Sequence, residues 1–286
     1  MTGPASLPIG IFDSGVGGLT VLRAVHDLLP NEELVYLGDT ARLPYGTKSP
    51  ESVQRYALHA AEYLVQRGIK LLVVACNTAS AVALDVLRHR LAPVPVIGVV
   101  EPGAAAATTL SKSHHYLVLA TEATSQRRAY TRAITALQPG AIIEELPCSL
   151  FVALAEEGWH EGDIADSIAE QYLGVVRARS AADRPDVAIL GCTHFPLLKP
   201  AIARSLGPGI AIVDSATTTA AAVGKELARA DLGAIHQAQD ERISLIATDG
   251  AARFARVGSA FLGKAFTASD IEIVDIHPSD LNDRLP

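Results

Sequence analysis

Short apolar runs alternate with longer amphipathic segments along most of the chain. The first part of this pattern predicts four β-strands, at residues 8–13, 33–39, 70–77 and 94–101. The segments between these runs have the spacing of α-helices, at residues 17–29, 52–68 and 79–91. Alternation of this kind is typical of βαβ units, which build a parallel sheet.

The same alternation then starts again further along the chain. Four more strands are predicted, at residues 116–121, 141–146, 186–193 and 210–215. Helices are expected to begin near Ala123, Ser149, Asp163 and Pro196. The chain is therefore predicted to be an α/β protein with two pseudo-symmetric, doubly wound parallel-sheet domains.

A third group of elements follows, with strands at residues 242–250 and 271–276 and a helix at 251–262. This group is too small to form a domain, so we expect it to complete the first sheet. The first domain would then be discontinuous, with residues 1–98 and 213–286, and the second domain, residues 99–212, would be inserted into it. Hinges are expected at residues 99–102 and near Asp214.

Composition supports a globular chain and limits the kinds of partner that it is expected to bind. Of the 286 residues, 49% are hydrophobic and only 5% aromatic, which suits helices packed closely on a parallel sheet. The net charge is -7 and no basic stripe is present, so nucleic acid is not expected as a partner. No signal-peptide pattern and no run of 18 apolar residues occurs, which argues against a membrane or secreted protein. We expect a cytoplasmic setting with free thiols.

Two of the three cysteines occupy the same place in two similar phrases. Cys76 lies in LLVVACNTAS and Cys192 in VAILGCTHFP, each directly after an apolar strand. In open α/β sheets ligands bind where strands end and helices begin, and a thiol at a helix N-terminus is expected to have a lowered pKa. We therefore expect the two thiols to face one cleft between the domains. Cys148 has no such context and is expected to be a buried structural residue.

A second pair of matching phrases places Asp-Ser at the end of a strand. Asp13 lies in GIFDSGVGG and Asp214 in AIVDSATTT. Such a carboxylate could assist a thiol or could cap the next helix. For Asp13 the two interpretations are balanced, whereas for Asp214 capping is favoured.

Two opposed thiols fit three kinds of site: a metal centre, a redox pair or a pair of catalytic bases. Cys192 and His194 are too close in sequence for the usual metal-ligand spacing, and no second cluster is evident, which disfavours a metal. Neither thiol has a resolving cysteine nearby in sequence, although a redox pair stays possible. Two bases are the sharper hypothesis, because one thiolate could take a proton from a carbon while the opposite thiol returns one to the other face.

Five fragments in register carry a family resemblance over nearly the whole length. They are IGIFDSGVGGLTVL, YLGDTARLPYGTKS, ACNTASA, VIGVVEPGA and LGCTHFPLL. On these fragments the chain resembles the glutamate racemases, cofactor-independent enzymes of the aspartate/glutamate racemase superfamily. The resemblance implies that Cys76 removes the α-proton of D-glutamate and Cys192 that of L-glutamate. It further implies that Asp13 assists Cys76, and that His194 and Glu156 assist Cys192.

The resemblance also implies a set of substrate-binding positions. They are Asp13, Ser14, Tyr45, Gly46, Asn77, Thr78, Thr121, Thr124, Thr193 and His194. One departure is visible, because many family members read Ala-Thr-x-Gly-Thr where this chain has Glu122-Ala123 between its two threonines. The threonine hydroxyls are retained, but the loop is expected to be stiffer.

Partners and cofactors follow from the same resemblance. It implies no metal and no cofactor, glutamate as the small-molecule substrate, a homodimer, and D-glutamate supply for peptidoglycan in a bacterial cytoplasm. The six lysines lie in no recognisable pyridoxal phosphate setting. Two alternatives remain: a related aspartate or hydantoin racemase with the same thiols, and a small-molecule binding protein with two α/β domains around a cleft.

Overall fold

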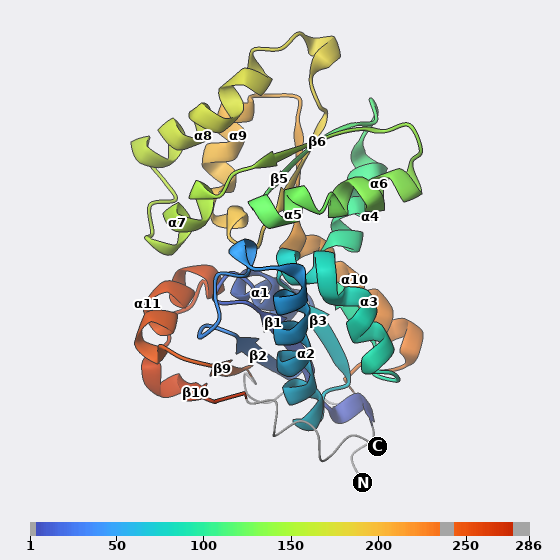
Figure 1. Cartoon of the computed structure of the whole chain (residues 1–286), viewed down its shortest axis with the longest axis vertical. Coiled ribbons are helices and arrows are strands. Elements are labelled where there is room, and N and C mark those ends of the chain that lie inside the picture. Colours follow the sequence, from blue (N-terminus) through green and yellow to red (C-terminus); the bar gives the residue numbers. More distant parts are fainter. Residues whose placement is uncertain (1–3, 235–242, 277–286) are drawn as a thin grey trace.

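The computed structural model describes residues 4–234 and 243–276, which form two parallel sheets with helices on both faces (Figure 1). The larger sheet has six strands in the order β10 (Ile271–Ile273), β9 (Ile243–Ala247), β2 (Leu34–Gly38), β1 (Ile9–Asp13), β3 (Leu71–Val74) and β4 (Val96–Gly98). All its pairings are parallel. The third group of elements therefore completes the first sheet, as predicted.

The smaller sheet has four strands and is also parallel throughout. Its order is β6 (Ile142–Pro147), β5 (His115–Ala120), β7 (Val187–Gly191) and β8 (Ala211–Asp214). β5 and β7 are buried along their whole length, whereas the edge strand β6 is partly exposed and includes Glu144 and Glu145. Continuous apolar runs for central strands and charges on an edge are what parallel sheets require. The predicted α/β class with two parallel-sheet units is confirmed.

Helices cover both sheets and define two lobes. Lobe one is the larger sheet with α1 (Leu19–Leu28), α2 (Pro50–Gln66), α3 (Asn77–Arg90), α10 (Ser215–Ala230) and α11 (Ala251–Leu262). Lobe two is the smaller sheet with α4 (Val100–Leu110), α5 (Glu122–Gln126), α6 (Ala129–Leu137), α7 (Leu150–Glu156), α8 (Asp163–Arg177) and α9 (Lys199–Leu206). Short 3₁₀ helices are η1 (Pro4–Ser6), η2 (Tyr45–Thr47), η3 (Ala181–Asp183), η4 (Phe195–Leu198) and η5 (Ala268–Asp270). None of the helices in the described residues is both long and apolar enough to cross a membrane.

The segments expected to act as hinges are regular structure. α4 begins at Val100, inside the predicted hinge at residues 99–102, because Glu101 and Pro102 are favourable in a first helical turn. At the second predicted hinge, β8 leads directly into α10. The Asp214 side chain accepts the Thr217 N–H at 2.9 Å and caps this helix. The division into domains at 98/99 and 212/213 stays a prediction. Since β8 pairs with β7 through Asp214, we propose that the second unit extends to residue 214.

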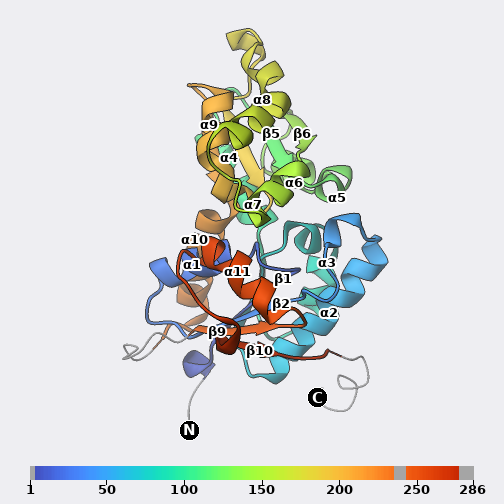
Figure 2. The same cartoon turned by 90° about the vertical axis from the view of Figure 1, so that its left-hand side faces the viewer.

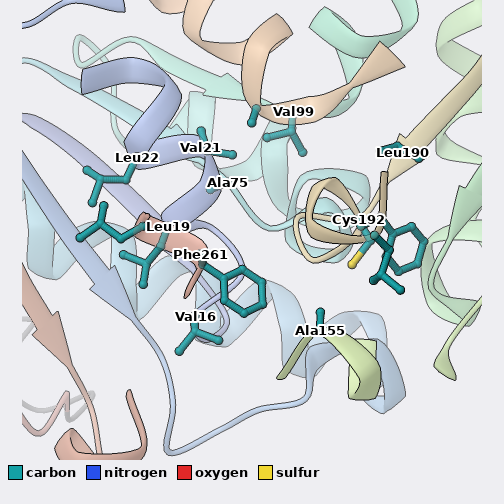
Figure 3. Close-up of a cluster of buried hydrophobic side chains, with 14 of the residues drawn as sticks. Val16, Leu19, Val21, Leu22, Ala75, Val99, Ala155, Leu190, Cys192 and Phe261 are labelled. Atoms are coloured by element: carbon teal, nitrogen blue, oxygen red, sulfur yellow. The ribbon is translucent and has the colours of Figure 1, made fainter. Parts of the chain in front are cut away.

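One apolar core crosses the boundary between the lobes. Figure 3 shows Val16, Leu19 and Phe261 of lobe one on one side, and Ala155 and Cys192 of lobe two on the other. All five belong to one cluster of buried side chains. The lobes are therefore held against each other by hydrophobic contact, which places the ends of both sheets at a shared interface.

Candidate active site

Direct hydrogen bonds join the lobes at the carboxyl ends of the strands. Thr20 at the start of α1 donates to the carbonyl of Thr193 at 3.0 Å, and Tyr130 on α6 donates to Asn77 Oδ1 at 2.9 Å. Both bonds are buried. Figure 2 shows α7 of lobe two above α11 of lobe one at the same boundary. The predicted site residues gather here.

Cys76 follows β3 and is the N-cap residue of α3. Its sulfur accepts the N–H of Ala79 at 3.5 Å and donates to the Ser14 hydroxyl at 3.5 Å, and the residue is 5% exposed. Burial, and then the charge of Asp13, raise the pKa of this thiol to about 12. The helix position was predicted, but the lowered pKa was wrong, because removing the sulfur from water outweighs the helix end.

Asp13 ends β1 and is almost completely buried. Its Oδ1 accepts the N–H of Gly15 at 2.8 Å, whereas α1 starts with Gly18 as N-cap and without a side-chain cap. The N–H of Gly18, the N-cap residue of α1, also acts on this carboxyl and lowers its pKa, so the capping and the thiol-assisting interpretations of Asp13 both stay predictions. Burial raises the pKa of its carboxyl, while the positive charge of His194 opposes that shift from across the lobe boundary. Gly18 permits this packing, since a Cβ there would lie 2.5 Å from the Asp13 Cβ.

Cys192 follows β7 and is supported by a chain of side chains. Its sulfur lies 3.7 Å from His194 Nδ1, and His194 Nε2 lies 3.2 Å from Glu156 Oε1. The other Glu156 oxygen accepts a hydrogen bond from Arg253 Nη2 at 2.8 Å. Cys192 precedes the 3₁₀ helix η4, which continues directly into α9, so the helical segment expected near Pro196 is present and begins with a 3₁₀ turn.

The protonation of His194 is set by this chain. Burial by itself would lower the pKa of the imidazole, but hydrogen bonds to Cys192 and Glu156 raise it to about 10. The ring is thus an imidazolium at neutral pH, with a proton directed at the Cys192 sulfur. The pKa of Glu156 is lowered by its hydrogen bond to His194 and by Arg253, so this carboxylate stays ionised.

The five predicted catalytic side chains form one electrostatic group. The charge of Cys192 acts to raise the pKa of Cys76, and the charges of Asp13 and His194 act on each other. Cys192 is 5% exposed, like Cys76. Cys148 is fully buried, and burial raises the pKa of its thiol to about 12. A thiol from each lobe, with its own polar helpers, therefore reaches one dry interface.

Tyr45 and Gly46 belong to η2, in the connection that follows β2. The Tyr45 hydroxyl donates to Asp39 Oδ2 at 2.6 Å, and Asp39 also accepts from Arg42 and from Thr248. Asp39 is completely buried. This network fixes the segment that brings Gly46 against Thr121, where an added Cβ would lie 3.7 Å from the threonine Cβ.

Three predicted threonines form a hydroxyl cluster across the lobe boundary. Thr78 of α3 lies 3.4 Å from both Thr121 and Thr124, which are 3.1 Å from each other. Thr121 is the N-cap residue of α5. Glu122 and Ala123, where the chain differs from the family pattern, lie in the first turn of that helix. Hydroxyl groups and helix N–H groups together suit a carboxylate.

Several residues at the site were not identified from the sequence. Asp39 lies directly after β2, so the rule that ligands bind at strand ends could have indicated it. Thr20, Tyr130 and Arg253 lie inside helices, and no local pattern distinguishes them.

The side chains at the site do not suggest a metal centre, and a small cavity lies at the lobe boundary. In residues 4–234 and 243–276 no group of three or more His, Cys, Asp or Glu side chains could hold a metal ion. A cavity of about 160 Å³ lies beside Glu156, between the Val16 and Leu43 side chains and α11.

Fold and site together define a two-lobed parallel α/β enzyme in which strand ends bring one thiol from each lobe to a common interface. The chain belongs to the Asp/Glu/Hydantoin racemase family, whose model matches residues 18–223, and it is therefore an isomerase.

Similar proteins agree with this assignment over nearly the full length. Glutamate racemase of Geobacter metallireducens is 48% identical over 89% of this chain and 92% of its own. Glutamate racemase of Koribacter versatilis is 43% identical over 94% and 97%, respectively. The crystal structure of glutamate racemase from Francisella tularensis in complex with D-glutamate has a TM-score of 0.85 at 33% identity, covering 95% of this chain and 98% of that one.

Proposed function

We propose that the chain interconverts L-glutamate and D-glutamate by proton transfer at Cα between two thiols. The observation that carries the proposal is the pair Cys76 and Cys192, one from each lobe, buried at one interface and electrostatically coupled. Relatives named glutamate racemase, matched over nearly the whole chain, support glutamate as the substrate. The D-glutamate complex of a similar structure supports the same choice.

The protonation of the two sides supports a definite first direction. Cys76 holds its proton at neutral pH, while the imidazolium of His194 stabilises negative charge on the Cys192 sulfur. From L-glutamate, the Cys192 thiolate takes the Cα proton, so a C–H bond breaks and an S–H bond forms. The Cys76 thiol then gives its proton to the opposite face, which leaves D-glutamate and a thiolate at Cys76. The reverse reaction starts from this second protonation state.

The barrier to removing an α-proton is high, so charge at the carbanion must be stabilised. The N–H groups of Asn77 and Thr78, the first two residues of α3, have no intrahelical acceptor. The Thr78, Thr121 and Thr124 hydroxyls lie near them. Donors of this kind act strongly in an interface from which water is excluded. We propose that they bind the substrate carboxylates and share the developing negative charge. To reset the enzyme after this direction of turnover, Cys76 would have to gain a proton, on the side of Asp13, and Cys192 would have to lose one, on the side of His194 and Glu156.

We further propose the cellular setting implied by the family. D-glutamate made by this enzyme would supply peptidoglycan synthesis, and through it the cell wall, in the cytoplasm. The enzyme would act as a homodimer without a cofactor.

Proton exchange at Cα tests the proposal. L-glutamate or D-glutamate incubated with the enzyme in D₂O is expected to gain deuterium at Cα as it racemises, which NMR and chiral chromatography can follow together. A panel with aspartate and a hydantoin run in parallel identifies the substrate. A binding protein would leave the Cα hydrogen in place, and exchange confined to aspartate would contradict the glutamate assignment.

A further inference from the structure

Asn77 presents an unpaired donor at the site. It is the first residue of α3, directly after Cys76, and is 3% exposed. Its Oδ1 accepts the Tyr130 hydroxyl, whereas its Nδ2 has no hydrogen-bond partner within the described part of the chain. A buried N–H group without a partner is costly, so such a group at a binding site calls for an acceptor on the ligand.

The Tyr130 ring is fixed so that its hydroxyl reaches this amide. The residue is completely buried, and glycines from two other elements pack against the ring. A Cβ on Gly103 of α4 would lie 3.3 Å from Cε1, and a Cβ on Gly191, at the end of β7, would lie 3.0 Å from Cε2. Side chains at these positions would crowd the ring, so the two glycines allow lobe two to hold Tyr130 in this place.

We propose that Tyr130 is a positioning residue that holds the Asn77 amide with its NH₂ group free to bind a substrate carboxylate. The inference rests on the proposed function in that the ligand is a dicarboxylic amino acid. A carboxylate accepts hydrogen bonds, so the amide must present nitrogen and not oxygen. By donating to Oδ1, the tyrosine hydroxyl selects that orientation.

The bond also links substrate binding to the placement of the lobes. Asn77 belongs to lobe one and Tyr130 to lobe two, so the amide is oriented only while the lobes are together. The donor beside Cys76 is thus ready for the substrate in the same arrangement that brings Cys192 to the interface.

A mutant cycle tests this role with two measurements. Tyr130→Phe keeps the packed ring and removes only the hydroxyl. We expect it to raise the KM of both glutamate enantiomers, and to weaken the binding of glutarate by calorimetry, by roughly tenfold. Glutarate is a dicarboxylate that cannot racemise, so this second measurement does not depend on turnover. In an Asn77→Ala background, Tyr130→Phe is expected to have no further effect.

Tyr116→Phe provides the matched control. Tyr116 is also completely buried, in the same apolar cluster of lobe two, and its hydroxyl donates to Gln138. Removing the Tyr116 hydroxyl is expected to lower thermal stability without changing KM or glutarate binding. Asn77→Asp keeps an acceptor for Tyr130 but has no NH₂ group, and it is expected to lose glutarate binding even if Tyr130→Phe fails to fold.

Three results would overturn the inference. They are unchanged binding in Tyr130→Phe, additive effects of Tyr130→Phe and Asn77→Ala, and normal glutarate binding by Asn77→Asp. An enzyme that racemises aspartate and not glutamate would contradict the proposed substrate alone, and the same cycle would then be measured with aspartate and succinate.

Discussion

The two thiols occupy equivalent positions in the two sheets, yet their surroundings differ. Cys76 contacts neutral groups, since it donates to the Ser14 hydroxyl and accepts from the N–H of Ala79, and it has the Asp13 carboxylate nearby. Cys192 instead contacts a charged ring, His194, which Glu156 supports in turn. Similar sequence phrases therefore place two thiols alike without making them chemically alike.

The difference supports the proposal that the two sides have opposite roles in any one turnover. Burial raises the pKa of Cys76 to about 12, so this thiol is an acid at neutral pH. The pKa of His194 is about 10, so its imidazolium places a positive charge beside the Cys192 sulfur. Under the proposed two-base scheme, one side starts as donor and the other as acceptor, and each turnover exchanges these roles.

Removing either thiol gives the largest expected effect. Cys76→Ala and Cys192→Ala should each lower racemisation by about 10³-fold or more in both directions, because every turnover uses both sulfur atoms. Chiral chromatography from each pure enantiomer measures the loss. Near-normal rates in both directions for either variant would contradict the two-base scheme, and circular dichroism controls for folding.

A bulkier residue at Gly17, where lobe one contacts Thr193 and His194 of lobe two, should have the next largest effect. A Cβ on Gly17 would lie 2.4 Å from Thr193 Oγ1 and 2.5 Å from His194 Nδ1, so Gly17→Ala must displace the ring that supports Cys192. We expect kcat/KM to fall by about 10²-fold, as displacements near 1 Å can cause. In the same loop, Gly15→Ala would meet only Leu43 at 3.5 Å and serves as the control. Equal losses in both variants would show that the loop, and not the ring, is sensitive.

Much of this arrangement could be predicted from the sequence. The strands and most helices follow from hydrophobic spacing, and strand ends located Cys76, Cys192 and Asp13. α4 was not predicted, because its Val-Val-Glu-Pro-Gly start resembles a connection more than a helix. The roles of the site residues stay predictions until they are measured.

The properties that depend on tertiary packing could not be predicted. A helix N-terminus suggested a lowered pKa for Cys76, but the extent of burial, which reverses the shift, depends on how Cys76 packs in the apolar core of lobe one. Tyr130 and Arg253 lie on helices of different lobes and reach the site only through the fold. Spacing along the chain contains no signal for such contacts.

A pH profile sharpens the comparison of the two sides. Glu156→Gln removes the negative charge that helps keep His194 protonated, so the pKa of the imidazole falls. The imidazolium is then lost at lower pH, and the alkaline limb of kcat/KM is expected to move to lower pH, with roughly tenfold lower activity at its optimum. The neighbouring exposed residue provides the control, because Glu157→Gln should leave the profile unchanged. An unshifted alkaline limb in Glu156→Gln would show that this carboxylate does not control the protonation of His194.

The smallest effect is expected from Arg253, at the outer end of the chain that supports Cys192. Its side chain is 56% exposed and its ion pair with Glu156 is correspondingly weak, so Arg253→Gln should lower kcat/KM only about two- to fivefold. The loss of kcat/KM must be the same for both enantiomers, because their free energies are equal, but only proton transfer at Cys192 becomes slower. The isotope effect with Cα-deuterated L-glutamate should rise above that with the D-enantiomer, whereas Arg256→Gln, an exposed change on the same helix, should alter neither. Equal isotope effects for the two enantiomers in Arg253→Gln would mean that this arginine joins the lobes without acting on the Cys192 side.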